Sequence, residues 1–233
     1  MMTSYHRFQH LDNQAGDTIM KIGIIGAGAI GQLYASLWST AGHQVMLSSR
    51  HPESIQLNSS QSNSIAFGTV QEAASFGEVI LLAVNYNTVD AALDAIRTAT
   101  VGKLVIDATN PLVWNKSGGT DRVIHDDEIA GLVMAKRLPK ARIAKAFTSL
   151  WTGYVEQHSN VDKPTIAMPL AADEAHDCDT VAELIKDAGL VPVVLGTLAE
   201  SRPLDPPSPI WNVVLTKNEL IERTQQFRAE LAA

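Results

Sequence analysis

From residue 20 onward, short apolar runs alternate with longer stretches in which apolar residues recur at helical spacing. Runs such as IGII and VILLAV are apolar at every position, which is typical of strands that are covered on both faces. The pattern predicts strands at residues 21–25, 44–48, 64–67, 79–83, 103–107 and 142–146, and helices at 29–41, 70–75, 88–98 and 126–136. This alternation predicts an α/β fold with a doubly wound parallel sheet.

After residue 146 the regular alternation of apolar strands and helices gives way to segments that carry aromatic residues and prolines. The pattern there predicts a helix at 174–188, a strand in LVPVVLG and a last helix from about residue 209 to 231. Between them, four closely spaced prolines predict an irregular loop: Pro203, Pro206, Pro207 and Pro209. We therefore expect three parts: a mobile N-terminal extension at 1–19, a main domain at 20–147, and a small C-terminal α/β part at 148–233 that packs on it and continues its sheet.

A glycine-rich turn follows the first predicted strand, and its residues are Gly26, Ala27, Gly28, Ala29, Ile30 and Gly31. In this G-x-G-x-x-G context Gly26 makes the tight turn, Gly28 lets the backbone approach a pyrophosphate, and Gly31 lets the next helix press on the sheet. The free N–H groups and the dipole at the helix start favour the diphosphate. Residues 20–147 are therefore predicted to be a dinucleotide-binding Rossmann domain; a purely structural turn is the alternative.

The second predicted strand ends in Ser48, Ser49 and Arg50, where an NAD site would place an Asp or Glu for the ribose 2′-hydroxyl. A carboxylate would repel a 2′-phosphate, whereas Arg50 can form a forked, charge-assisted pair with it, and the serine hydroxyls can add hydrogen bonds. The sequence therefore predicts a preference for NADP(H). The alternative is that Arg50 is a solvated loop charge and that the site takes NAD equally well.

The segments MKIGIIGAGAIG, AGHQVMLSSR, VILLAVNYNTV, VIDATNP and IAKAF occur in this order between about residues 20 and 200. In this respect the chain resembles the NADPH-dependent F420 (deazaflavin) reductases and their dinucleotide-binding relatives, and it is similar to the reductase domain of the STEAP metalloreductases. The resemblance implies NADP(H) held by residues 27–31, the 2′-phosphate at Ser49 and Arg50, and F420 or a flavin as the second substrate.

The resemblance also implies a nicotinamide side near Ala83, Val84, Asn110, Pro111 and Ala146. The first four lie at or just past the carboxyl ends of two predicted strands, where open α/β sheets bind ligands. Asn110 can offer its amide to a ring or a ribose, and Asp107 is expected to organise the turn before it. The chain departs from its relatives after the sixth strand, where Thr148 and Ser149 replace the usual Asn-Thr, so the acceptor side is expected to differ.

The possible reactions differ in whether they need a side chain that donates a proton. Reduction of a carbonyl creates an alkoxide and calls for a positioned acid, whereas a flavin-like ring absorbs the charge itself. The sequence has no Tyr-x-x-x-Lys pair and no Ser-His-Asp arrangement, which favours hydride exchange with a planar ring. The acceptor-side candidates are Lys145, interpreted first as a strand-edge charge, Thr148, Trp151 and Tyr154. Reduction of a small carbonyl or imine and a non-catalytic NADP(H)-sensing module stay open.

Net charge, cysteine content and the length of the apolar runs limit the partners and the cellular compartment that we expect. The formal net charge of −7 and the lack of a Lys/Arg run argue against nucleic acid and anionic lipid as partners. Cys178 is the only cysteine, so no intrachain disulfide or multi-cysteine metal site can form, and we interpret it as a bystander thiol. No apolar run approaches the roughly 20 residues of a membrane span. A cytoplasmic protein with a small-molecule redox acceptor is expected, and the proline-rich C-terminal segment is compatible with a homodimer.

Overall fold

The computed structural model describes residues 19–55, 64–159 and 163–232. The expectation of a mobile extension at 1–19 concerns a segment that lies, apart from its last residue, outside the described residues. Within the described ranges, none of the helices combines the length and the apolar character that crossing a membrane requires.

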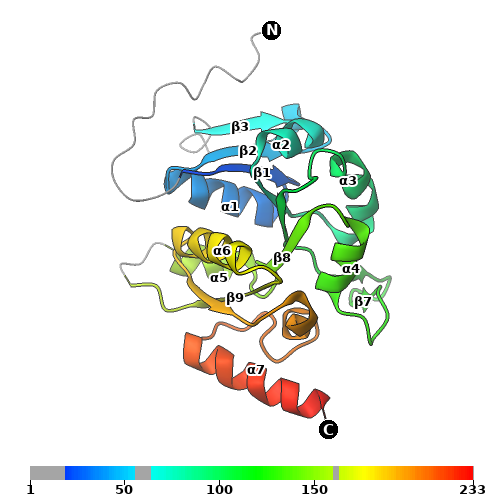
Figure 1. Cartoon of the computed structure of the whole chain (residues 1–233), viewed down its shortest axis with the longest axis vertical. Helices are drawn as coiled ribbons and strands as arrows, with labels where there is room; N and C mark the ends of the chain where they lie inside the picture. Colours follow the sequence, from blue (N-terminus) through cyan, green and yellow to red (C-terminus); the bar gives the residue numbers. More distant parts are fainter. Residues whose placement is uncertain (1–18, 56–63, 160–162, 233) are drawn as a thin grey trace.

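An eight-stranded sheet runs through the molecule in the order β10-β9-β8-β5-β4-β1-β2-β3 (Figure 1). Its strands are β1 (Lys21–Ile25), β2 (Gln44–Ser48), β3 (Ile65–Gly68), β4 (Val79–Leu82), β5 (Leu104–Asp107), β8 (Arg142–Ala146), β9 (Ala167–Ala172) and β10 (Val191–Val194). All neighbours are parallel except β8 and β9. The predicted doubly wound fold is confirmed, and the order reverses direction beside β1, where such sheets form a ligand crevice.

Helices cover both faces of the sheet because successive residues of each buried strand point to opposite sides. Ile22 and Ile24 pack on one side with α1 (Ala29–Thr40), α5 (Thr152–His158) and α6 (Ala175–Asp187). Ile25 packs on the other side with α2 (Val70–Phe76), α3 (Val89–Ile96) and α4 (Ala130–Arg137). Figure 1 shows α1 and α6 close together, with α3 and α4 across the sheet.

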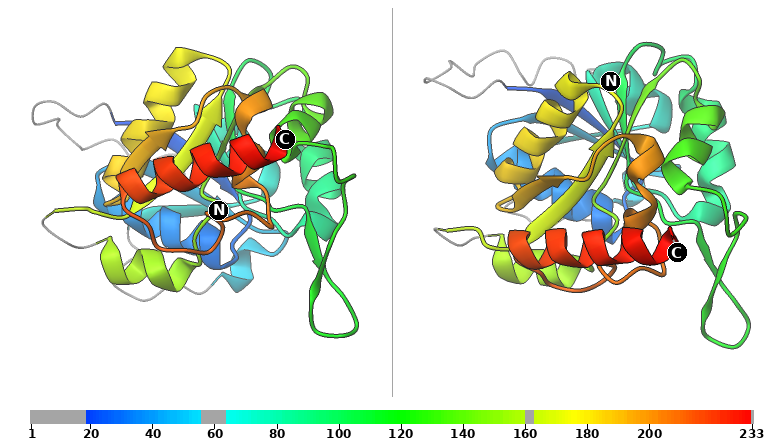
Figure 2. Two further views of the ribbon diagram at one scale, coloured as in Figure 1. Left: turned by 90° about the horizontal axis from the view of Figure 1, so that it is seen from below. Right: turned by 60° about the horizontal axis from the view of Figure 1, so that its bottom comes forward.

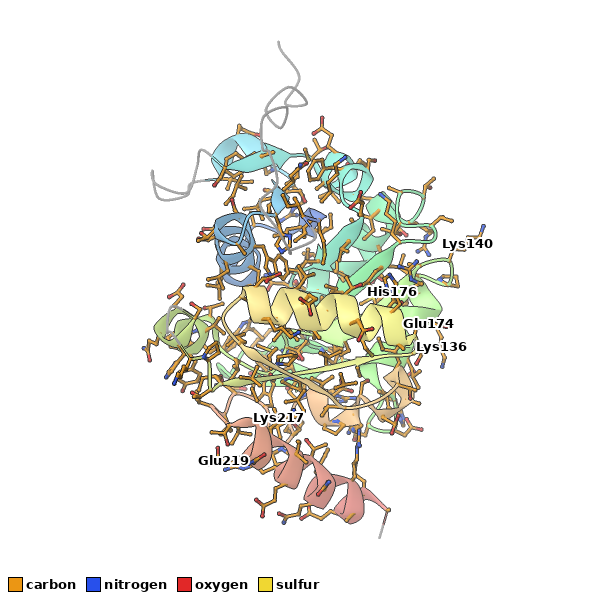
Figure 3. The ribbon with its side chains drawn as sticks, turned by 60° about the vertical axis from the view of Figure 1, so that its left-hand side comes forward. Lys136, Lys140, Glu174, His176, Lys217 and Glu219 are labelled. Atoms are coloured by element: carbon orange, nitrogen blue, oxygen red, sulfur yellow. The ribbon has the colours of Figure 1, made fainter. Side chains whose placement is uncertain are left out.

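The C-terminal part continues the sheet, as the sequence predicts. A smaller core joins β9 and β10 to α7 (Lys217–Leu231), with Leu204, Ile210 and Leu220 buried at its centre. The first turn of α7 begins at a capping box of Thr216 and Glu219, and Figure 3 shows Lys217 and Glu219 at that end of the helix. The predicted start of this helix near residue 209 is therefore wrong. Residues before Thr216 are tied to the sheet instead, since the N–H of Ala167 donates to the carbonyl of Leu215 at 2.8 Å.

Three other elements differ from the sequence prediction. Helix α4 begins at Ala130 instead of residue 126, because its first N–H is capped from far along the chain by Asp205 Oδ2 at 2.9 Å. Helix α5 was not predicted, since its seven residues show no clear period. The loop at residues 112–122 contains a two-stranded antiparallel hairpin of β6 (Leu112–Trp114) and β7 (Thr120–Arg122).

Candidate functional site

The glycine turn lies between β1 and α1 at the carboxyl edge of the sheet. Gly26 has φ +111°, and a Cβ there would lie 2.4 Å from the carbonyl oxygen of Ala83. Gly31 touches the turn itself, since its Cβ would lie 1.9 Å from the carbonyl oxygen of Gly26. At Gly28, in contrast, nothing lies within 4 Å of the missing Cβ. The space above Gly28 is therefore open to a ligand, while the other two glycines are required by the fold.

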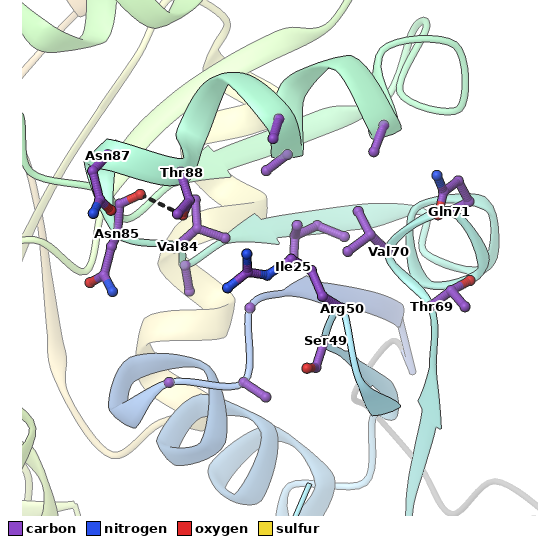
Figure 4. A pocket seen from close by; sticks show the side chains of 17 residues that line it. Ile25, Ser49, Arg50, Thr69, Val70, Gln71, Val84, Asn85, Asn87 and Thr88 are labelled. Atoms are coloured by element: carbon purple, nitrogen blue, oxygen red, sulfur yellow. Dashed lines mark hydrogen bonds between the residues drawn. The ribbon is translucent and has the colours of Figure 1, made fainter. Parts of the chain in front are cut away.

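A cavity of about 590 Å³ opens above this turn (Figure 4). Ser49 and Arg50, at the end of β2, line it together with Gly26, Ala27 and Gly28. In Figure 4 the guanidinium of Arg50 extends into the cavity beside Ile25 and Val84, and Ser49 lies on the same rim. The exposed cation of Arg50 and the hydroxyl of Ser49 thus line the same cavity as the glycine turn.

Ser48 differs from the sequence prediction. Its side chain is fully buried, and its hydroxyl donates to the carbonyl of Ile24 in β1 at 2.8 Å. The backbone carbonyl of Ser48 accepts from the N–H of Gly26 at 3.2 Å. Ser48 therefore holds the glycine turn against β2, and its hydroxyl cannot reach a ligand in the cavity.

Sequence reasoning missed the opposite wall of this cavity. It is formed by the start of α2 and by the region from Asn85 into α3, and the residues are Thr69, Val70, Gln71, Asn85, Asn87, Thr88, Ala91, Ala92 and Ala95. The three alanines recur on one side of α3, and their small side chains leave room for a flat group. No motif marks these positions, although the spacing of Ala91 and Ala95 at i, i+4 could have indicated a shared helix face.

A second, smaller cavity of about 270 Å³ adjoins the first at Gly28, Ala83 and Val84. Asn110 lines it together with Ala29, Ile30, Asn85, Tyr86, Ala108, Thr109 and Leu112. The Asn110 amide donates to the carbonyl of Thr148 at 3.1 Å, and its buried Oδ1 has no hydrogen-bond partner. A buried amide oxygen of this kind needs a donor, and a bound ligand can provide one.

Two predicted residues of this side lie behind the cavity. Pro111 is buried, and its carbonyl accepts from the N–H of Val123 at 3.0 Å. Ala146 is fully buried in β8. Phe147 follows with φ 60° and packs against Tyr34 and Trp38, with ring centroids 4.4 and 5.5 Å away. Pro111 and Ala146 therefore shape the wall from behind.

Lys145 is buried, so its prediction as a strand-edge charge is wrong. Its side chain is 0% exposed because β8 lies inside the sheet, between β5 and β9. Its Nζ donates to Asp107 Oδ2 at 2.7 Å and to the carbonyl of Thr109 at 2.5 Å. The other oxygen of Asp107 accepts from the Thr109 N–H and hydroxyl at 2.9 and 2.6 Å. Asp107 thus organises the turn after β5, as expected, and Lys145 completes it.

A second buried carboxylate, Asp205, lies in the proline-rich loop. Arg122 and Arg202 each approach its Oδ2 at 3.6 Å. Burial raises the pKa of Asp205, while nearby Lys145, the N–H of Ala130 and the two arginines oppose that rise. The carboxylate therefore connects the C-terminal loop to α4 and to the base of the hairpin.

The remaining acceptor-side candidates line neither cavity. Thr148 is buried, and its hydroxyl donates to the carbonyl of Leu204 at 3.4 Å. Trp151 and Tyr154 pack edge to face, with ring centroids 5.6 Å apart, at the start of α5. Cys178 is half-buried on α6, and burial raises the pKa of its thiol. A raised thiol pKa disfavours the nucleophilic thiolate.

Residues 21–111 match the family described as NADP oxidoreductase, coenzyme F420-dependent. The chain is similar to the metalloreductase STEAP3 of Rattus norvegicus, with 26% identity over 186 residues, 79% of this chain and 36% of the relative. It therefore spans about a third of the length of that curated relative.

Two solved structures share the fold. A hypothetical protein from Sinorhizobium meliloti superposes with a TM-score of 0.73 and 26% identity over 85% of this chain and 96% of that one. A proposed F420-dependent NADP reductase from Arthrobacter sp. FB24 superposes with a TM-score of 0.68 and 19% identity over 78% and 87%. At 19% identity, the similarity to the Arthrobacter structure shows the fold alone. The resemblance stated from the sequence is confirmed over residues 21–111, which match the model of the F420-dependent NADP oxidoreductase family.

Proposed function

We propose that this protein exchanges a hydride between NADP(H) and a planar redox cofactor, for which F420 and the flavins are the models. The observation that carries the proposal is the lining of the smaller cavity. Among the described residues that line it, Tyr86 alone has an ionisable side chain. A carbonyl substrate needs an acid at the reacting atom, whereas a flavin-like ring spreads the charge over its own atoms. The protein then contributes placement and exclusion of water.

The larger cavity fits the nucleotide half of NADP(H). The open space over Gly28 fits a pyrophosphate, which would accept from the N–H groups at the start of α1. Arg50 and Ser49 are the groups in this cavity suited to a 2′-phosphate, through a charge-assisted and a neutral hydrogen bond. When bound, NADPH supplies the hydride from its nicotinamide ring.

The smaller cavity fits the nicotinamide end. Asn110 Oδ1 has no partner and would accept from the carboxamide N–H of the ring, which fixes its orientation. Ile30, Val84 and Leu112 give the cavity apolar walls that exclude water. The Lys145–Asp107 pair holds the Thr109 turn that carries Asn110 and exposes no proton donor of its own.

The test is oxidation of NADPH by the purified protein, followed at the absorbance of the reduced nicotinamide, with F420, FMN, FAD, ferric chelates and small carbonyls in parallel. Turnover with F420 or a flavin is expected. Turnover with carbonyls alone would contradict the proposal. Tight NADPH binding without oxidation by any acceptor would point to a sensing module instead.

Reduction of a small carbonyl or imine is the second candidate, and Tyr86 is the observation that favours it. Burial raises the pKa of its phenol, and Arg137, which opposes the rise, lies over the ring with its guanidinium carbon 5.6 Å from the centroid. The phenol is thus protonated at neutral pH and able to donate. A Tyr86→Phe variant should keep its turnover with a planar acceptor; loss of turnover with a carbonyl, at unchanged NADPH affinity, would support the second candidate.

A further inference from the structure

The hairpin of β6 and β7 projects from the body of the molecule, as the two views of Figure 2 show for this green segment. Its turn is closed by Asn115, whose Oδ1 accepts from the N–H groups of Ser117 and Gly119 at 3.1 and 2.9 Å. The Asn115 side chain also donates to Asp121 Oδ1 at 2.9 Å. The hairpin therefore has a hydrogen-bonded turn and a defined register between its two strands.

The base of the hairpin is fixed to the rim of the smaller cavity. Leu112, the first residue of β6, lines that cavity. Opposite Leu112 in the register stands Arg122. Arg122 donates to the carbonyls of Pro206 at 3.1 Å and Glu128 at 2.7 Å, and it lies beside the buried Asp205. These bonds hold the hairpin in one position relative to the cavity.

Trp114 stands on the same face of β6 as Leu112, because side chains two residues apart in a strand point to the same side. Two residues of strand span about 7 Å, so its indole lies one step outward from the cavity wall. The side chain is 81% exposed, the most exposed of the large hydrophobic residues described. The indole is thus exposed on a fixed arm, where its face is free to stack on a flat ring.

We propose that Trp114 is the stacking platform for the outer part of the planar acceptor, and thereby selects flat, extended ring systems over small carbonyls. This inference rests on the proposed function and extends the same site outward. The smaller cavity, at about 270 Å³, adjoins the nucleotide cavity and has Leu112 in its wall. A tricyclic ring that meets the nicotinamide there extends beyond the cavity, past Leu112, to the indole.

The test combines binding and turnover. FMN is titrated into the protein loaded with NADP⁺, and stacking is followed by the quenching of flavin fluorescence. Trp114→Ala should raise the Kd for FMN about tenfold, the scale of aromatic stacking, with unchanged Kd for NADPH. Trp114→Phe should restore part of the affinity. Val113→Ala, on the opposite face of the same strand, is the matched control and should behave as the wild type.

In turnover, Trp114→Ala should raise KM for F420 or FMN with a small change in kcat. The FMN titration tests the stacking role of Trp114 independently of the proposed function. Equal FMN affinity in Trp114→Ala and the wild type, or no FMN binding at all, overturns the stacking role. Binding that depends on Trp114 without any oxidation of NADPH supports the stacking role and contradicts the proposed function.

Discussion

Adjacent residues of the same type have different roles in this site, because side chains alternate between the interior and the cavity at the end of a strand. Ser48 is buried and bonds to β1, while Ser49 lines the larger cavity. Lys145 shows the same principle for charge: its position within β8 places an ammonium inside the molecule, where Asp107 neutralises it at 2.7 Å. The chemistry available to each residue is therefore set by the direction of its side chain.

Arg50→Ala should weaken NADPH binding by about 1.5 to 3 kcal/mol, the value of a hydrogen bond to a charged group, and leave NADH binding nearly unchanged. The reason is that the guanidinium has a 2′-phosphate to contact in one nucleotide only. Calorimetric titration of both nucleotides measures the difference. Arg97→Ala, on the exposed surface of the molecule, serves as the control. An equal loss for both nucleotides would show that Arg50 does not select between them.

Lys145→Met should lower the free energy of unfolding by about 3 to 5 kcal/mol, because the Asp107 carboxylate then stays buried without its cation. The double variant Lys145→Met with Asp107→Asn should be less destabilised than the sum of the two single variants, since no charge is left unpaired. Urea unfolding of the three variants gives this coupling. Additive losses would mean that the two groups do not interact.

At the scale of elements, helix starts are secured by short polar motifs and by glycine contacts. Three capping boxes begin α2, the 3-10 turn at Leu198–Glu200 and α7, and their members are Thr69 with Glu72, Thr197 with Glu200, and Thr216 with Glu219. The start of α1 has no side-chain cap; Gly28 lines both cavities, and Ala29 and Ile30 line the smaller one. The starts of α3, α5 and α6 also lack a side-chain cap, so α1 is set apart by its place beside both cavities and not by the missing cap.

The two glycines Gly28 and Gly31 should respond differently to alanine. Gly28→Ala should leave the melting temperature nearly unchanged, since nothing lies within 4 Å of its Cβ, but should weaken NADPH at least about tenfold. Gly31→Ala should destabilise the fold by about 3 kcal/mol or more, because its Cβ overlaps a backbone oxygen. Thermal unfolding and nucleotide titration separate the two effects. Normal NADPH affinity in Gly28→Ala would place the pyrophosphate elsewhere.

The capping boxes should contribute to stability in a pH-dependent way. Hydrogen bonds from the backbone and hydroxyl of the preceding threonine lower the pKa of Glu72, Glu200 and Glu219. A lowered folded-state pKa gives stability that is full above the pKa of the unfolded chain and is lost as pH falls through the folded value.

A triple Glu→Gln variant at these positions should therefore lose less stability than the wild type between about pH 7 and about pH 4. Glutamine keeps the geometry of the box and removes only the titration. Urea unfolding at the two pH values measures the difference, with Glu222→Gln, outside any box, as the control. A steeper acid loss in the triple variant would contradict the assignment.

At the scale of the whole molecule, one sheet runs through both halves of the chain. β9 pairs with β8, and the indole of Trp38 in α1 donates to the carbonyl of Leu184 in α6 at 2.8 Å. The smaller cavity also depends on both halves, since Asn110 bonds to Thr148 and Arg122 is held by the proline-rich loop. The division into two parts at residue 147 rests on the change in sequence pattern there and stays a prediction. The homodimer stays a proposal, which sedimentation can test.

A fragment of residues 20–147 should fail to fold cooperatively, because it leaves the edge of β8 and the aromatic cluster around Trp38 without β9 and α6. Circular dichroism and thermal unfolding of the fragment and the full chain provide the comparison. A fragment with a sharp transition and native NADPH affinity would show that the main domain is independent.

The sequence by itself determined the Rossmann architecture, the glycine turn and the position of Ser49 and Arg50 at a strand end, because apolar runs, glycine spacing and strand ends are local features. The sequence did not determine the features that depend on contacts between residues far apart in the chain. The start of α4 depends on Asp205, the burial of Lys145 depends on β9, and the hairpin that presents Trp114 depends on Arg122. Only the tertiary structure decided these, because each is set by groups that are distant in sequence and adjacent in space.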